Sequence, residues 1–212
     1  NSFGASVSHY KNNHYSLRYS HQAKNWNHQV AVKGSKDRSF SYESYGLSEF
    51  ETRRQMLNYL VRNQVSDTLS VGGGLELAKD KVADFSPSSR DTESAFVNVN
   101  YVGKTYLADF ALRSDDVEGV ANETTFNLGA GMRINADHIV SINFGQGFKA
   151  PTFNDLYYPG SGNPDLQFET SDNVELIYKG NFGASALTVS IFDSEIENLI
   201  QWAPNAQGFW FP

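Results

Sequence analysis

The sequence lacks cysteine altogether and contains only two methionines, six prolines and no long apolar run. Without cysteine there is neither a disulfide framework nor a thiolate metal site. No window approaches the roughly 18 consecutive apolar residues of a membrane helix, which excludes a helical membrane protein. The net charge of −7, with no stripe of Lys and Arg along the sequence, argues against a nucleic-acid partner.

The chain instead has 14% aromatic residues, 17 glycines and many segments in which apolar and polar residues alternate. This alternation predicts an all-β fold, an antiparallel meander of about eleven strands with almost no helix. The expected strands are 2–10, 14–24, 28–42, 50–64, 68–79, 92–102, 104–114, 123–134, 138–148, 171–181 and 184–203.

Each strand has an apolar row and a polar row. In 123–134, Leu128 and Met132 share one face, whereas Asn127 and Arg133 share the other. A polar row of this kind is costly in a dry core, where each unpaired polar group costs roughly 1–3 kcal/mol. We therefore expect a membrane barrel with its apolar rows toward lipid and its polar rows toward water. A soluble extracellular β-barrel or sandwich, which also alternates, stays open as an alternative.

The predicted connections alternate between short and long. Short turns fall at 24–27, 65–67, 102–104, 135–137 and 180–183, and long connections fall at 36–49, 80–91, 114–122 and 148–170. One rim with tight turns and one with long loops is typical of outer-membrane barrels. The short turn expected at 11–13 falls on the wrong rim and is an exception. Aromatic residues near strand ends are expected to form interfacial belts, namely Tyr59, Tyr101, Tyr106, Phe144 and Tyr178.

The longest connection combines backbone-bending residues with aromatic ones. Pro151 and Pro164 fix φ and cannot pair in a ladder, and Gly160 and Gly162 tolerate positive φ, so the chain should leave the sheet here. Aromatic and amide side chains in this loop could contact a large ligand or could pack against neighbouring loops. These ligand-binding candidates are Phe153, Asn154, Tyr157, Tyr158 and Asn163.

The same loop carries a family resemblance. Its motif consists of Phe148, Lys149, Ala150 and Pro151, then Asp155-Leu156-Tyr157, then Asn163, Pro164, Leu166 and Glu169. This series resembles the signature of the TonB-dependent outer-membrane receptors, and within them it is most similar to the cobalamin transporters. Gln167-Phe168 departs from the family pattern, which has Lys or Asp followed by Pro there.

The resemblance implies a fold and a cellular place. It implies a 22-stranded transmembrane β-barrel in the lipid of the bacterial outer membrane, with an N-terminal plug and TonB as partners. About eleven strands are half of such a barrel, so residues 1–212 are expected to be a partial β-barrel domain without the plug and the C-terminal strands.

The resemblance also implies a transported ligand. Cobalamin is the first expectation, and an iron chelate, either haem or a ferric siderophore, is the alternative. Haem receptors typically place a ligating His in this loop, and residues 148–170 contain none.

No motif predicts catalysis or a resident cofactor. We find no nucleophile arrangement with Ser, His and Asp, so the chain is not expected to be an enzyme. Calcium in the outer loops is a further expectation, with Asp80, Asp84 and Asp91 as candidate ligands. Their spacing matches no calcium-binding loop, and solvated acidic loops are the simpler interpretation.

Overall fold

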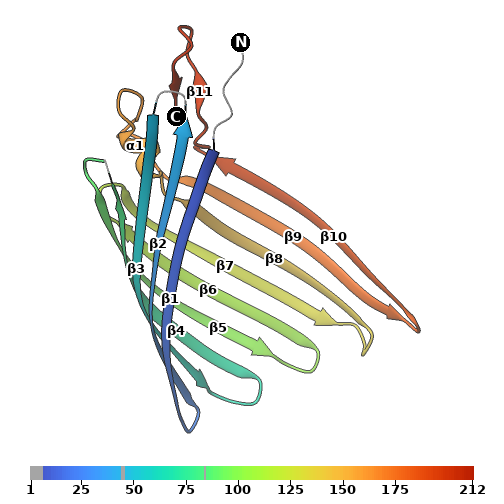
Figure 1. Cartoon of the computed structure of the whole chain (residues 1–212). Coiled ribbons are helices and arrows are strands. Elements are labelled where there is room, and N and C mark those ends of the chain that lie inside the picture. Colours follow the sequence, from blue (N-terminus) through green and yellow to red (C-terminus); the bar gives the residue numbers. More distant parts are fainter. Residues whose placement is uncertain (1–6, 44–45, 84) are drawn as a thin grey trace.

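The computed structural model describes residues 7–43, 46–83 and 85–212 as a curved, ten-stranded antiparallel sheet with a small cap at one end (Figure 1). A short helix and a separate two-stranded sheet form this cap. The elements are β1 (Val7–Ala23), β2 (Trp26–Glu43), β3 (Gly46–Gln64), β4 (Leu69–Val82), β5 (Ser89–Val102), β6 (Tyr106–Val117), β7 (Ala121–Arg133), β8 (His138–Lys149), α1 (Phe153–Tyr157), β9 (Glu169–Phe182), β10 (Ser185–Glu197), β11 (Ala203–Pro204) and β12 (Trp210–Phe211). Within the described residues, no helix has the length and apolar character needed to cross a membrane.

Each strand of the large sheet pairs with its neighbours in sequence, in the order β1 to β10. The predicted all-β meander is therefore confirmed. The turns that join β1 to β2, β3 to β4, β5 to β6, β7 to β8 and β9 to β10 lie together at one end of the sheet, and α1 and β11 lie at the other (Figure 1). We call these ends the short-turn rim and the loop rim. The sheet is curved but not closed, and β1 and β10 are its two edges.

The prediction of eleven strands is wrong at the N-terminal end of the described chain. The expected strands 2–10 and 14–24 belong to one strand, β1, and the expected turn at 11–13 does not form. Residues 2–6 of the first expected strand lie outside the described residues. Lys11 pairs with Arg38 and Asn13 with Lys36, so the ladder to β2 continues through these polar residues. Long-range pairing here overrides the local turn preference of Asn. The exception to the rim asymmetry disappears with the turn.

Three of the four expected long connections are shorter than predicted, because the strands extend into them. β2 extends to Glu43, β4 to Val82 and β6 to Val117. Strands of 12 to 19 residues are longer than the roughly 9–11 residues that cross a bilayer. The parts of these strands beyond the apolar band have no lipid on either face, so their sequences do not alternate between apolar and polar residues. The sequence pattern there therefore resembled that of a loop. Conversely, the expected strand 184–203 is too long, since β10 ends at Glu197.

The apolar rows are uncovered on one face of the sheet, which we call the outer face. Leu75, Leu128 and Ile142 are each more than half exposed, at 56%, 51% and 51%. On the opposite, inner face, Ser94 and Asp115 are buried. A soluble sandwich would bury the apolar rows against each other, and a soluble barrel would turn them toward its interior. The exposed apolar rows contradict both forms of the soluble alternative.

Most of the expected belt aromatics lie near the short-turn rim. Tyr59, Tyr101, Tyr106 and Tyr178 share the outer face with the apolar rows, and Tyr59 and Tyr178 each hydrogen-bond a His ring nitrogen, at 2.8 and 2.7 Å. Phe144 is an exception. It lies in the middle of β8, where it stacks on Phe126 with ring centroids 5.2 Å apart.

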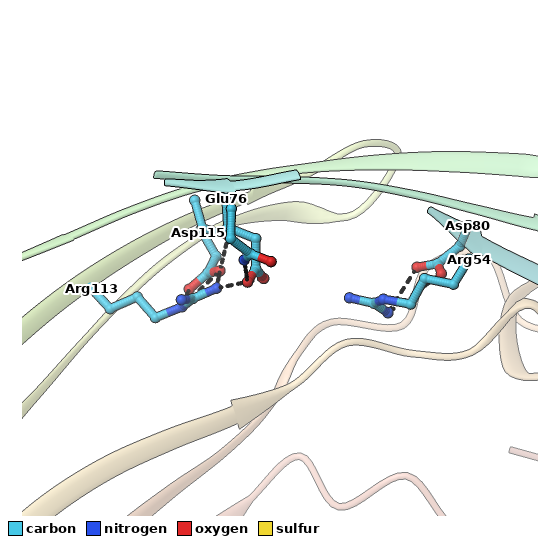
Figure 2. A network of polar contacts seen from close by, with 7 residues as sticks. Arg54, Glu76, Asp80, Arg113 and Asp115 are labelled. Atoms are coloured by element: carbon cyan, nitrogen blue, oxygen red, sulfur yellow. Dashed lines mark hydrogen bonds and ion pairs between the residues drawn. The ribbon is translucent and has the colours of Figure 1, made fainter. Parts of the chain in front are cut away.

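The inner face carries a network of charged side chains, and Figure 2 shows them projecting from the same side of the sheet. Arg113 donates to Asp115 at 2.7 Å and pairs with Glu76 at 3.4 Å. Ser94 donates to Asp115 at 2.6 Å, and Arg54 pairs with Asp80 at 3.2 Å. The inner face is thus polar and internally hydrogen-bonded, as a water-filled barrel requires.

Candidate functional site: the loop between β8 and β9

A capped helical turn, α1, begins the loop. Thr152 is its N-cap: its hydroxyl accepts a bond from Asp155 N at 3.2 Å, and the Asp155 carboxylate accepts from Thr152 N at 2.8 Å. This reciprocal capping box satisfies backbone donors at a helix start. The sequence predicted almost no helix and none at this position, although Thr-x-x-Asp was a usable signal.

Asp155 also holds the C-terminal segment of the described chain. Its carboxylate accepts a hydrogen bond from the Trp202 indole at 2.7 Å, and the residue is only 7% exposed. Burial alone would raise the pKa of Asp155, but the bonds from Trp202 and Thr152 outweigh it and hold the pKa below the usual value. The ionised carboxylate therefore joins α1 to Trp202, which lies 47 positions further along the chain.

Arg90 fixes the start of the loop to the sheet. Its guanidinium donates to the Pro151 carbonyl at 2.7 Å and lies over the Phe153 ring, 5.1 Å from the centroid. Pro151 is fully buried and Phe153 is 7% exposed. A cation over a partly desolvated aromatic face is attractive, so this contact both orients and holds the helical turn.

The second half of the loop folds back onto α1. Asn163 N donates to the Asp155 carbonyl at 2.7 Å, and the Asn163 side chain accepts from Asp165 N at 3.0 Å. Gly162 lies so close to α1 that a Cβ there would be 2.5 Å from Tyr158 N. A side chain at this position would separate the two halves of the loop.

The two ends of the family motif meet where the loop closes. Lys149 pairs with Glu169 at 3.4 Å, and the rings of Phe148 and Phe168 lie 5.0 Å apart. Glu169 also accepts a bond from Ile200 N at 3.2 Å. The motif residues Phe148, Lys149, Pro151, Asn163 and Glu169 thus act as the frame of the loop.

The five candidate ligand-binding residues all lie in this loop but differ in access. Phe153 is buried and Asn163 is half-buried in its turn. Asn154 and Tyr158 are exposed, and Tyr157 is half-buried. Sequence reasoning missed Arg90 and Trp202 as parts of the site, because each lies far away along the chain and neither has a local motif. Trp202 also packs edge-on against Tyr158, with centroids 5.8 Å apart.

The described calcium candidates are engaged by basic side chains. Asp80 pairs with Arg54 at 3.2 Å and Asp91 with Lys79 at 2.9 Å, while Asp84 lies outside the described residues. No group of three or more His, Cys, Asp or Glu that could hold a metal ion occurs in the described part of the chain. Asp80 and Asp91 as they stand do not fit a calcium ion, and calcium stays a prediction for the complete loop.

A curved antiparallel meander with an apolar outer face and a polar inner face is typical of part of the wall of a transmembrane β-barrel. The sequence comparison agrees: residues 1–211 match the family described as TonB dependent receptor-like, beta-barrel, and the chain belongs to it. This is a family of receptors and transporters rather than enzymes, and its homologous members are outer-membrane proteins.

The individual relatives are of two kinds. The chain is 35% identical over 191 residues to the vitamin B12 transporter BtuB of Photobacterium profundum, covering 86% of this chain and 31% of that protein. It is 30% identical over 200 residues to a BtuB of Vibrio vulnificus, covering 89% and 32%. Among solved structures, the siderophore receptor PirA from Pseudomonas aeruginosa superposes with a TM-score of 0.81 at 17% identity, covering 92% of this chain and 40% of that one. The chain spans about a third of the length of the curated relatives.

Proposed function

We propose that this chain forms part of the barrel wall of a receptor that binds cobalamin and imports it across the bacterial outer membrane. The observation that carries the proposal is the 35% identity to a vitamin B12 transporter over 86% of the chain. The plug domain and TonB are the expected partners in the whole receptor, since TonB partnership is general to the family.

The loop between β8 and β9 is the part of this chain best suited to touch the ligand. Asn154, Tyr157 and Tyr158 offer an amide and two phenol groups at the surface of a frame held by Arg90 and Asp155. Tyrosine gives a broad amphipathic contact with few rotatable bonds, which suits a large planar ligand. The inner face supplies a polar passage for the ligand. Import involves no covalent step in this proposal, so we expect the receptor not to be an enzyme.

Iron chelates are the competing ligands. The solved siderophore receptor PirA from Pseudomonas aeruginosa resembles this chain at 17% identity, which supports a shared fold and says little about the ligand. Haem is disfavoured, because residues 148–170 contain no histidine to ligate iron.

Ligand titration of the full-length receptor tests the proposal. The purified receptor, in detergent, should bind cyanocobalamin at nanomolar concentration and bind haem and ferric enterobactin far more weakly. Replacing Tyr158 with Ala should weaken cobalamin binding, while Tyr106→Ala, at the short-turn rim, should leave it unchanged. Tight binding of haem or a ferric siderophore without cobalamin binding would reject the assignment.

A further inference from the structure

Neutral amide side chains are concentrated in two adjacent register rows of the inner face. One row contains Asn98 of β5, Asn127 of β7 and Asn173 of β9, and the next contains Asn100 of β5 and Asn143 of β8. Between β4 and β9 the remaining positions of the two rows are Gly72, Ala111 and Gly145, then Ser70, Asp109, Gly129 and Glu175. We call these twelve residues the amide track.

The track crosses the wall diagonally from one rim toward the other, because the strands of a barrel are tilted and a register row crosses them. Asn173 is the fifth residue of β9 counted from the loop rim, Asn127 lies in the middle of β7, and Gly72 is the fourth residue of β4 counted from the short-turn rim. Asn173 also lies four residues after Glu169, which pairs with Lys149 where the loop between β8 and β9 closes. The track therefore joins the base of the candidate ligand loop to the opposite rim.

The surface of the track has low relief. A Cβ at Gly72 would lie 2.6 Å from Asn98 Oδ1, and a Cβ at Gly145 would lie 2.6 Å from Asn127 Oδ1. Both asparagine side chains thus lie across a glycine of the neighbouring strand, in space that any other residue would fill. Their amides are still accessible, since Asn127 is exposed and Asn98 is half-buried. A ligand on this surface meets hydrogen-bonding groups without large steps between them.

The charge of the track differs from that of the wall above it. In the adjoining rows toward the loop rim, Arg113 pairs with Asp115 and Glu76, so these charges satisfy one another (Figure 2). The track has no Lys or Arg, and its two charged residues, Asp109 and Glu175, are both acidic. An anionic iron chelate would be repelled here. Cobalamin carries primary amides around its ring, and these donate and accept hydrogen bonds as Asn does.

We propose that the amide track is the part of the wall along which cobalamin passes from the rim loop to the short-turn rim. Each neutral amide–amide hydrogen bond contributes little net free energy, because it replaces bonds to water. The ligand can therefore exchange one Asn for the next along the track without being held at any of them. This inference rests on the proposed function and adds the path that the ligand follows after capture.

The test separates capture from passage in cells that produce the full-length receptor. Binding of radiolabelled cyanocobalamin is measured in cells de-energised with a protonophore, and uptake is measured in energised cells. The track variant carries Asn98→Leu, Asn127→Leu and Asn143→Leu, which keep the approximate size and remove the amides. The control variant carries Asn12→Leu, Gln29→Leu and Asn181→Leu, which remove three amides from the inner face outside the track.

The track variant should bind cyanocobalamin within twofold of the wild type but import it at least fivefold more slowly, and the control should stay within twofold in both assays. Import at the wild-type rate by the track variant, an equal loss in the control, or a parallel loss of binding would each overturn the proposal. Hydrogen exchange of the plug in the resting receptor should be the same in the track variant and the wild type. Faster exchange would show that the track holds the plug instead, which also overturns the proposal.

A single substitution covers the case in which the triple variant does not fold. Gly145→Ala places a Cβ against Asn127 Oδ1, so the Asn127 side chain must turn into the lumen. Import should slow at least twofold with binding unchanged, and an unchanged rate counts against the proposal. If the wild type binds no cobalamin, the proposed function itself fails. If the wild type imports cobalamin and both track variants do so equally fast, only this inference fails.

A second arm tests the chemistry of the track with a modified ligand. Cyanocobalamin in which one side-chain amide is hydrolysed to a carboxylate should show a lower ratio of uptake to binding than cyanocobalamin, because Asp109 and Glu175 repel it. Asp109→Asn should raise that ratio for the carboxylate and leave it unchanged for cyanocobalamin. Equal ratios for the two ligands in the wild type would contradict the passage of the ligand along this wall.

Discussion

Asp155 is the residue on which the rim loop depends most. It caps α1, accepts the Trp202 indole and is nearly buried. Replacing it with Asn keeps the shape but removes the charge, and hydrogen bonds to charged groups are worth about 1.5–3 kcal/mol. We expect Asp155→Asn to increase hydrogen exchange in residues 152–163 of the full-length receptor. Trp202→Phe, which removes only one donor, should have a smaller effect, and an equal effect would contradict this account.

The same carboxylate predicts a pH dependence. Its pKa is lowered in the folded loop, so its stabilising contribution is complete above the unfolded value of about 3.9 and is lost as pH falls through the folded value. Protection of the loop against proteolysis should thus be constant from pH 7 to about pH 4 and fall below it. In the Asp155→Asn variant this fall should be absent.

Gly162 and Gly160 are required for different reasons: Gly162 for a close backbone contact and Gly160 for a positive φ. A Cβ at Gly162 would meet backbone atoms of Leu156, Tyr157 and Tyr158, whereas Gly160 has open space but a φ of +78°. Gly160→Ala should therefore cost about 1 kcal/mol, from φ alone. Gly162→Ala should displace the loop and weaken ligand binding more than Gly160→Ala does. Equal binding by the two variants would show that the close contact is unimportant.

At the scale of the strand, the alternation of residues decides which substitutions are tolerated. Leu128 is on the outer face of β7, and its neighbour Asn127 is on the inner face. An Arg at the membrane midplane costs about 2–4 kcal/mol on the lipid side and little on a wet side. Leu128→Arg should thus reduce the stability of the full-length receptor in vesicles by that amount. Asn127→Arg should reduce it by less than about 1 kcal/mol, and the reverse order would invert the assignment of faces.

The strand ends show how far alternation can be used as a guide. Within the band, alternation correctly predicted β4, β5, β7 and β8 to within a few residues. Above the band, the polar stretches at 36–49, 80–91 and 114–122 were predicted as loops, yet at least half of each is strand. No lipid acts on those stretches, so backbone pairing with the neighbouring strand holds them without an apolar row. The polar segment 11–13 was predicted as a turn for the same reason.

At the scale of the whole molecule, the sheet has two open edges. β1 and β10 each have a partner on one side only within the described residues. Unpaired edges of 17 and 13 residues invite pairing with another chain. The 212-residue chain expressed alone should therefore form dimers or larger oligomers in detergent, measured by light scattering, while the full-length receptor stays monomeric. A monodisperse monomer of the short chain would mean that the edges pair with each other.

The sequence by itself determined the strands within the membrane band, the two faces of the sheet and the family, because lipid on one side and water on the other impose a period of two. It also placed Asn154, Tyr157 and Tyr158 in one rim loop. Only the tertiary structure joined Arg90 to Pro151 and Asp155 to Trp202, and aligned Lys36, Arg53 and Lys81 on three neighbouring strands. Those contacts depend on strand register and loop closure, which bring together residues that no local pattern relates.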